Sequence, residues 1–141
     1  MSDMYNLRII AADRVFYEGP CLSLIVPAFD GEKEALAHHD SMVIAVTDGE
    51  MRYKTEDGTW HIGYVGRGFV QIANNRVLLL TESAEKPEEI DVRRAEEAKE
   101  RALEQLRQKQ SIQEYYHSSA SLARAMARLK TSRQTAGKIR I

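Results

Sequence analysis

Four arginines in the last third of the chain have the spacing of a phosphate-binding cluster. Arg94 and Arg101 lie seven residues apart, and Arg124 and Arg128 lie four apart, so each pair shares one face of a helix. If the two helices pack together, four guanidinium groups repel one another unless an anion separates them. Because arginine forks match phosphate oxygens, the pattern indicates a polyphosphate site. The alternative is surface pairing with the nearby carboxylates of Glu97, Glu100 and Glu104.

Other residue types that could do chemistry are not arranged to do it. His38 and His39 are adjacent and would point to opposite faces of a strand, and no spacing among the histidines matches a zinc site. His39, Asp40 and Ser41 are consecutive and cannot form a catalytic triad by themselves. The single cysteine, Cys21, excludes an internal disulfide, and its apolar neighbours indicate a small core residue. We therefore expect neither an enzyme nor a metal site.

Glycine and proline divide the chain into two parts near residue 88. All three prolines and seven of the eight glycines lie in residues 1–87, and neither type occurs between Glu88 and Ala136. The first part alternates apolar and polar residues between turn signals, as β-strands do. The second is rich in Ala, Glu, Arg and Leu, which favour helices. The sequence therefore predicts two domains, 1–87 and 88–141.

The first domain contains repeated turn signals, because Gly, Asp and Asn tolerate positive φ. They are Asp30-Gly31, Asp48-Gly49, Asp57-Gly58 and Asn74-Asn75. Short strands at this spacing predict an antiparallel sandwich or flattened barrel. Gly63, Gly66 and Gly68 do not match a dinucleotide-binding fingerprint, since no helical pattern follows them, and they indicate close approaches of the backbone.

The second domain is predicted to be two antiparallel helices. Asp91 can cap the first helix, and Ser111 with Glu114 fits a capping box for the second. Small and apolar residues recur at helical intervals: Ala95, Ala98 and Ala102 in the first helix, and Ala120, Ala123 and Ala127 beside Leu122, Met126 and Leu129 in the second. Such stripes bury little area, so the hairpin should be marginal alone and closable by a bridging ligand. The segment from Thr131 to Ile141 is expected to fray.

The predicted fold class is therefore α+β, an N-terminal antiparallel β-sandwich followed by a C-terminal antiparallel two-helix hairpin. Residues 1–87 carry 8 basic and 13 acidic side chains, whereas residues 88–141 carry 12 basic and 8 acidic ones. A basic second domain suits an anionic ligand or an acidic partner, although interleaved charges are also typical of a solvated helix face. The sequence shows neither a bilayer-spanning apolar segment nor a signal peptide, so we expect a cytosolic or peripheral protein.

The order of these features resembles the epsilon subunit of bacterial F-type ATP synthases over nearly the whole chain. The matching stretches are Arg14 to Gly19, Asp30 to Glu32, Gly68 to Val70, Glu89 to Asp91, Arg94 to Ala98 and Ala123 to Leu129. The resemblance implies a non-catalytic central-stalk subunit on the cytoplasmic face of the cell membrane, without membrane insertion or nucleic acid. Its ten-stranded sandwich would bind the gamma subunit and the c-subunit ring, coupling ion-driven rotation to ATP synthesis. A free-standing nucleotide-sensing protein is the alternative.

The resemblance also implies roles for individual residues. The helices would extend towards the catalytic alpha and beta subunits and inhibit ATP hydrolysis, with no cofactor required and ATP as a regulatory ligand that holds the hairpin closed. The residues that match ATP-binding positions are Glu85, Asp91, Arg94, Ala95, Arg101, Arg124 and Arg128. Glu32 and His39 match positions that contact the c ring and gamma. The segment Leu36 to Ser41 lacks the two prolines and the glycine that the family commonly has there.

Overall fold

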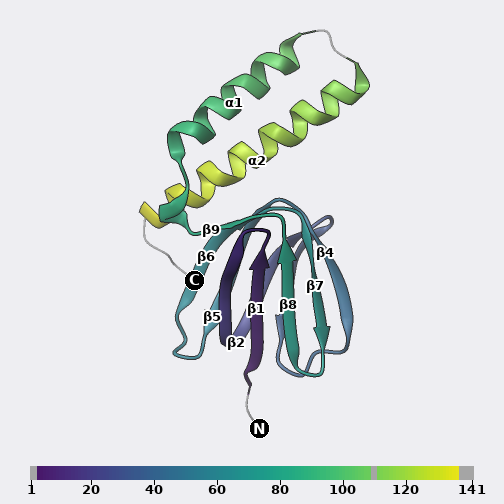
Figure 1. Ribbon diagram of the computed structural model, residues 1–141, viewed down its shortest axis with the longest axis vertical. Coiled ribbons are helices and arrows are strands. Elements are labelled where there is room, and N and C mark those ends of the chain that lie inside the picture. Colours follow the sequence, from purple (N-terminus) through teal and green to yellow (C-terminus); the bar gives the residue numbers. More distant parts are fainter. Residues whose placement is uncertain (1–2, 109–110, 137–141) are drawn as a thin grey trace.

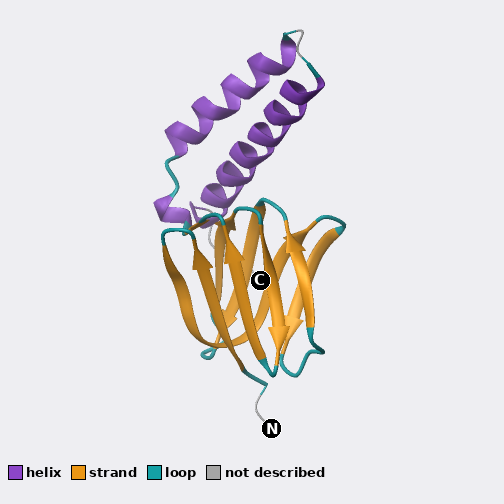
Figure 2. Cartoon of the chain, turned by 45° about the vertical axis from the view of Figure 1, so that its right-hand side comes forward, coloured by secondary structure: helices purple, strands orange, loops and turns teal. Residues whose placement is uncertain are grey.

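The chain forms a two-layered body of strands with two helices side by side at one end (Figures 1 and 2). The computed structural model describes residues 3–108 and 111–136, apart from the side chains of 134–136. The strands are β1 (Tyr5–Ala11), β2 (Arg14–Ala28), β3 (Gly31–Leu36), β4 (Met42–Val46), β5 (Gly49–Thr55), β6 (Trp60–Val65), β7 (Gly68–Ala73), β8 (Arg76–Thr81) and β9 (Ala84–Glu85). The 3₁₀ helix η1 (Pro87–Glu89) leads into α1 (Val92–Arg107) and α2 (Ile112–Ala136). The predicted fold class is confirmed.

Strand β2 joins the two layers. Its first part pairs with β1 and its second part with β3 and β5, and its register shifts between Cys21 and Ser23. One layer is ordered β2-β1-β8-β7-β4 and the other β3-β2-β5-β6-β9. Every pairing is antiparallel except the parallel pair β1–β8. The described residues form nine strands, and the ten that the resemblance implies are reached only by counting the two parts of β2 separately.

The core lies between the two layers. Strand β1 alternates buried and outward-facing residues, so that Leu7 and Ile9 lie beside Leu79 and Val70 on the inner face of one layer. Cys21 is fully buried in the same cluster, which confirms it as a core residue. Burial of these side chains supplies most of the driving force for folding this part of the chain.

Three glycines stand where a Cβ would meet a close neighbour. A Cβ at Gly68 would overlap the carbonyl oxygen of Leu80, and one at Gly66 would lie 2.9 Å from Ser83 Oγ. At Gly63 it would lie 3.0 Å from the carbonyl oxygen of Glu85. The prediction of close backbone approaches is confirmed at Gly63 and Gly68, whereas the close neighbour of Gly66 is a side chain.

The turns follow the sequence with one exception. Asn74 and Asn75, with φ of 54° and 57°, close the hairpin between β7 and β8 as predicted. Asp48-Gly49 does not close a hairpin, because β4 pairs with β7 while β5 pairs with β2 and β6. His38 lies in the turn after β3, with φ of 62°. Its backbone N–H donates to Asn75 Oδ1 at 2.7 Å, which holds the turn in place.

Both helices begin at the predicted caps. The Asp91 side chain accepts a hydrogen bond from the Arg94 backbone N–H at 3.0 Å, and Ser111 Oγ accepts one from the Glu114 N–H at 3.1 Å. In α1, Ala95 and Ala102 are buried as predicted. Each cap satisfies a backbone donor that has no partner within its helix.

The alanine stripe predicted for α2 is wrong at Ala120 and Ala123, which are exposed. The neighbouring apolar stripe is right at Leu129, which is buried, and wrong at Met126, which is exposed. Among the side chains of this helix that the structure describes, the buried ones are Ser118, Ala125, Leu129 and Thr131. Apolar residues occur on nearly every side of α2, so their spacing does not single out the face that packs.

The expectation that the chain frays from Thr131 is also wrong as far as the structure describes it. Helix α2 continues to Ala136, and Thr131 is fully buried with its hydroxyl donating to the Ala127 carbonyl at 2.9 Å. Tertiary contacts explain this order, because α2 packs against η1, β5 and β6. Residues 137–141 of the predicted frayed segment lie outside the described residues.

Candidate functional site

A pocket of about 490 Å³ lies where the hairpin meets the sandwich. Its walls come from β9, η1, the first half of α1 and the middle of α2. The lining residues are Glu85, Glu89, Asp91, Arg94, Ala95, Ala98, Arg101, Ala125 and Arg128. Every residue predicted to bind ATP is among them except Arg124. The structure thus brings together residues that are more than forty positions apart in the sequence.

The helical period places the two arginines of α1 at this pocket. Arg94 and Arg101 are separated by two helical turns and therefore project from one face. Ala95 and Ala98 lie on the pocket side of the same helix, and Ala125 lies across from them on α2. Because alanine side chains are short, this part of the hairpin leaves space for a ligand.

The guanidinium groups of Arg94 and Arg101 are not neutralised by protein. Both residues are exposed, and neither side chain has an ion pair or hydrogen bond within the described part of the chain. The alternative of surface pairing does not hold for these two arginines. Glu97 pairs instead with Arg93 at 3.2 Å, and Glu104 pairs with Arg107 at 2.9 Å.

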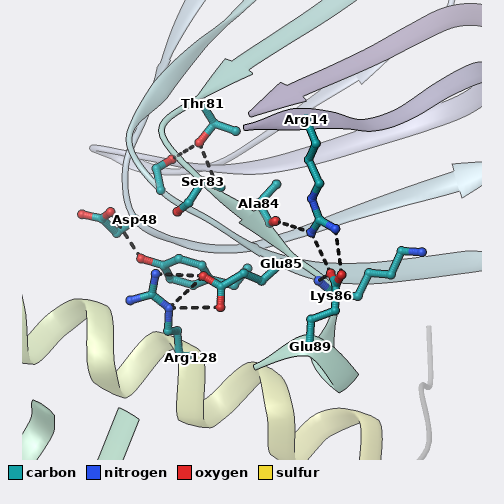
Figure 3. Close-up of polar contacts among 11 residues, drawn as sticks. Arg14, Asp48, Thr81, Ser83, Ala84, Glu85, Lys86, Glu89 and Arg128 are labelled. Atoms are coloured by element: carbon teal, nitrogen blue, oxygen red, sulfur yellow. Dashed lines mark hydrogen bonds and ion pairs between the residues drawn. The ribbon is translucent and has the colours of Figure 1, made fainter. Parts of the chain in front are cut away.

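Arg128 reaches from α2 to the sandwich (Figure 3). Its Nη2 and Nε donate to Glu85 Oε2 at 2.9 and 3.1 Å, and its guanidinium lies 4.3 Å from the centre of the Tyr64 ring. Burial raises the pKa of Tyr64 to about 12, so its hydroxyl stays protonated and donates to Asp48 Oδ1 at 3.4 Å. Arg124 instead donates to Ser121 Oγ on its own helix at 3.2 Å.

A second ion pair holds η1 at the edge of the pocket (Figure 3). Arg14 donates through both terminal nitrogens to the Glu89 carboxylate at 2.7 Å, and also to the Ala84 carbonyl at 2.8 Å. The hydrogen bonds from Arg14, followed by that from the Lys86 backbone N–H, lower the pKa of Glu89 to about 2. Sequence reasoning did not identify this pair, because its two members are 75 residues apart.

With Arg14, which pairs with Glu89 from outside the lining, the pocket gathers four guanidinium groups and three carboxylates. The carboxylates of Glu85 and Glu89 are each bound to an arginine, and Asp91 uses one oxygen to cap α1. The side chains of Arg94 and Arg101 form no ion pair with the described residues, so they can donate to an anion with several oxygens. Tyr64, Glu89 and Ala125 belong to the site and were not anticipated; no signal in the sequence links them to the arginines.

Glu32 and His39 lie at opposite ends of β3 and are not brought together. Glu32 is exposed and accepts from Arg52 Nη2 at 3.1 Å. His39 is half-buried in the turn after β3, where its Nδ1 lies 2.8 Å from the Asp40 carbonyl oxygen. The two residues therefore mark different ends of the sandwich.

An apolar row crosses the outer face of the β1-β8-β7-β4 layer. The strand register aligns, across the layer, Ala45, Phe69, Leu80, Ile10 and Val15. Val15 and Phe69 are 54% and 41% exposed, and the hairpin leaves this face uncovered (Figure 1). Contiguous exposed apolar side chains of this kind mark protein-binding surfaces.

Among residues 3–108 and 111–136, no group of His, Cys, Asp and Glu side chains could hold a metal ion. Neither helix is long and apolar enough to cross a membrane in the part of the chain that the structure describes.

Two family models match consecutive parts of the chain. The β-sandwich domain of the ATP synthase delta/epsilon chain matches residues 4–87, and its long α-helix domain matches residues 88–133. Among curated proteins, the ATP synthase epsilon chain of Ruminiclostridium cellulolyticum is 42% identical, covering 91% of this chain and 95% of the relative. That of Caldanaerobacter subterraneus is 38% identical, covering 92% and 94%.

The fold is also similar to that of solved structures. A chain from the Euglena gracilis mitochondrial ATP synthase, in a complex of OSCP, F1 and c-ring, has a TM-score of 0.78 at 19% identity, covering 98% of this chain and 84% of that one. Together with the two family models, the pairing of sandwich and hairpin shows that the protein belongs to the ATP synthase delta/epsilon family, as an epsilon chain and hence a non-catalytic subunit.

Proposed function

We propose that this chain works in the central stalk of an F-type ATP synthase at the cytoplasmic face of the cell membrane. There it couples ion-driven rotation to ATP synthesis and inhibits ATP hydrolysis through its helices, with ATP locking the hairpin in its folded form. The observation that carries the regulatory part is the pocket in which the side chains of Arg94 and Arg101 have no partner among the described residues. Family membership favours this role over a free-standing nucleotide sensor.

The physical basis of the lock is that the pocket exists only when the hairpin is folded. Arg94 and Arg101 lie on α1, Arg128 on α2 and Glu85 on β9. Bringing these arginines together without a ligand costs electrostatic free energy, and a polyphosphate removes that cost while accepting charge-assisted hydrogen bonds. A ligand that binds only the folded form increases its population. Arg124 would join the site only by leaving Ser121.

The sandwich supplies the surface for stalk partners. The apolar row that contains Phe69 is the face proposed to bind gamma, because it runs across the strands, includes exposed apolar side chains and is free of the hairpin. Glu32 and His39, at the two ends of β3, are proposed to contact the c ring and the base of gamma. The alpha and beta subunits are proposed to contact the helices only when the hairpin extends.

Binding to purified gamma tests the stalk role. Phe69→Glu should weaken binding at least tenfold, because it places a carboxylate within the apolar row. Phe29→Glu is the matched control: Phe29 is 94% exposed at the turn between β2 and β3 and lies outside the row. Equal binding by both variants and the unmodified chain would place the gamma contact elsewhere.

A further inference from the structure

Tyr64 and Glu85 form a cradle for one arginine on the surface of the sandwich. They are directly paired across β6 and β9, so their side chains stand side by side. Tyr64 is fully buried, and its ring and the Glu85 carboxylate hold the Arg128 guanidinium between them. Asp48, in the connection between β4 and β5, accepts from the Tyr64 hydroxyl at 3.4 Å. Three separate segments of the sandwich thus support one side chain of α2.

We propose that this cradle is a latch that docks the hairpin on the sandwich, and that Tyr64 is a positioning residue that acts through Arg128. Arg128 and Glu85 are 29% and 24% exposed, so both charges are partly withdrawn from water and their attraction is less screened than at a free surface. A guanidinium over an aromatic ring gains further when it is desolvated. By comparison, Lys54 of β5 lies 5.8 Å from the ring of Trp60 on β6, a looser contact.

The latch can open without disturbing the start of the helical domain. The Arg14–Glu89 pair fixes η1 to the beginning of β2. Ile90 and Asp91 have extended backbone conformations between η1 and α1. A change of backbone angles at these two residues can therefore swing the helices while η1 stays in place, and the Arg128 contact must then break together with the packing of α2 against η1, β5 and β6.

The latch and the pocket share Arg128. Glu85 engages Nε and Nη2, whereas Nη1 has no protein partner among the described residues and can donate to a phosphate oxygen. An anion can therefore bind while Arg128 stays in the cradle. Because both hold the same guanidinium group, anion binding should stabilise the docked hairpin, and docking should strengthen anion binding. This coupling rests on the proposed function, but the latch itself does not, since it forms between protein groups alone.

Amide hydrogen exchange of the whole chain, measured without nucleotide, tests the latch. Arg128→Gln should raise exchange of the α2 amides around Ala125 to Thr131 about tenfold, the factor expected from losing a desolvated cation–π contact. Arg128→Lys keeps the charge but loses the planar fork, so its α2 amides should exchange at rates between those of the unmodified chain and those of Arg128→Gln. Lys130→Gln removes a neighbouring exposed charge and is the matched control. Core amides such as that of Leu79 should not change.

A double-mutant cycle distinguishes positioning from simple burial. If Tyr64 acts through Arg128, Tyr64→Leu should raise exchange of the α2 amides in the unmodified chain but add little to Arg128→Gln. Tyr64→Phe, which keeps the ring, should retain most of the protection. Should Tyr64→Leu not fold, Glu85→Gln takes its place in the cycle. Additive effects would overturn the positioning role, and equal exchange in Arg128→Gln and Lys130→Gln would overturn the latch.

The same variants separate the latch from the nucleotide proposal. With ATP present, protection of α2 should increase further in the unmodified chain and much less in Arg128→Gln. Coupling in the double-mutant cycle without any response to ATP would support the latch and contradict the nucleotide lock. A response to ATP without coupling between Tyr64 and Arg128 would support the lock and contradict the positioning role of Tyr64.

Discussion

Glu89 shows how one residue can join two parts of the molecule that the sequence keeps apart. Its carboxylate accepts from both terminal nitrogens of Arg14 and from the Lys86 backbone N–H, so it closes η1 and ties it to β2. Local rules predict the turns that contain Asn or Gly, the cap at Asp91 and the shared face of Arg94 and Arg101. A pairing over 75 residues does not, because it depends on the completed fold.

Arg14→Gln should raise the pKa of Glu89 from about 2 towards its ordinary value, because the main cause of the shift is the hydrogen bonding from Arg14. A carboxyl whose folded pKa is lowered stabilises the fold above its unfolded pKa, and this contribution is lost as pH falls from there towards the folded pKa. The unmodified chain should therefore lose stability through this group between about pH 4.5 and 2, and the variant should not. Carbon-detected NMR titration of the Glu89 carboxyl measures the pKa directly. Arg67→Gln, which breaks a distant surface pair with Glu82, is the control and should leave it unchanged.

The arginines show how far residue-level prediction reached. Spacing grouped the four correctly in pairs on two helices, and the folded hairpin places Arg94, Arg101 and Arg128 around one pocket. The spacing could not show that Glu85 would neutralise Arg128 or that Ser121 would accept a hydrogen bond from Arg124, since both contacts depend on where a flexible side chain finds a partner. Helical period gives the direction of a Cβ, whereas the end of a long side chain is set by its surroundings.

At the scale of elements, the helices differ in how clearly their sequences specify a packing face. In α1, charged residues surround a single stripe, so the buried Ala95 and Ala102 are predictable. In α2, apolar residues lie on both the packed and the exposed side, and the stripe expected at Ala123 faces solvent. In such a helix the spacing of apolar residues cannot identify the packing face, because no side of the helix is uniformly polar.

The corrected face of α2 makes a direct prediction. Ala125→Leu should destabilise the hairpin by about 1–3 kcal/mol, because a larger side chain must force the helices apart where Ala125 is buried. Ala123→Leu should change stability by no more than about 0.5 kcal/mol, since that position is exposed. Urea unfolding followed by helical circular dichroism gives both values. A larger loss of stability in Ala123→Leu than in Ala125→Leu would contradict this packing face and support the stripe predicted from the sequence.

At the scale of the whole molecule, the break in composition near residue 88 and the α+β fold were readable from the sequence. The path of β2 through both layers and the parallel pair β1–β8 were not. Turn signals and alternation specify strands but not their partners, which are decided by the closure of the whole sheet. The hydrophobic core itself lies entirely between Tyr5 and Ala84, so it needs no residue of the hairpin.

A chain ending at Glu89 should therefore fold by itself and keep the Arg14–Glu89 pair. We expect a cooperative thermal transition, retained binding to gamma and lost inhibition of ATP hydrolysis, because the apolar row belongs to the sandwich and the basic helices do not. Calorimetry, a gamma-binding assay and hydrolysis by the reassembled complex measure the three properties. A non-cooperative transition would contradict an independent sandwich, and inhibition that survives truncation would contradict the division of roles.

Calorimetric titration of the whole chain with ATP tests the regulatory claim most directly. The account predicts saturable binding at one site, weakened at least tenfold by Arg101→Gln, since a hydrogen bond to a charged group contributes about 1.5–3 kcal/mol. Arg107→Gln removes an arginine of the same helix that pairs with Glu104 outside the pocket, and it should bind ATP like the unmodified chain. No saturable heat up to millimolar ATP, or equal weakening by both substitutions, would contradict the nucleotide lock.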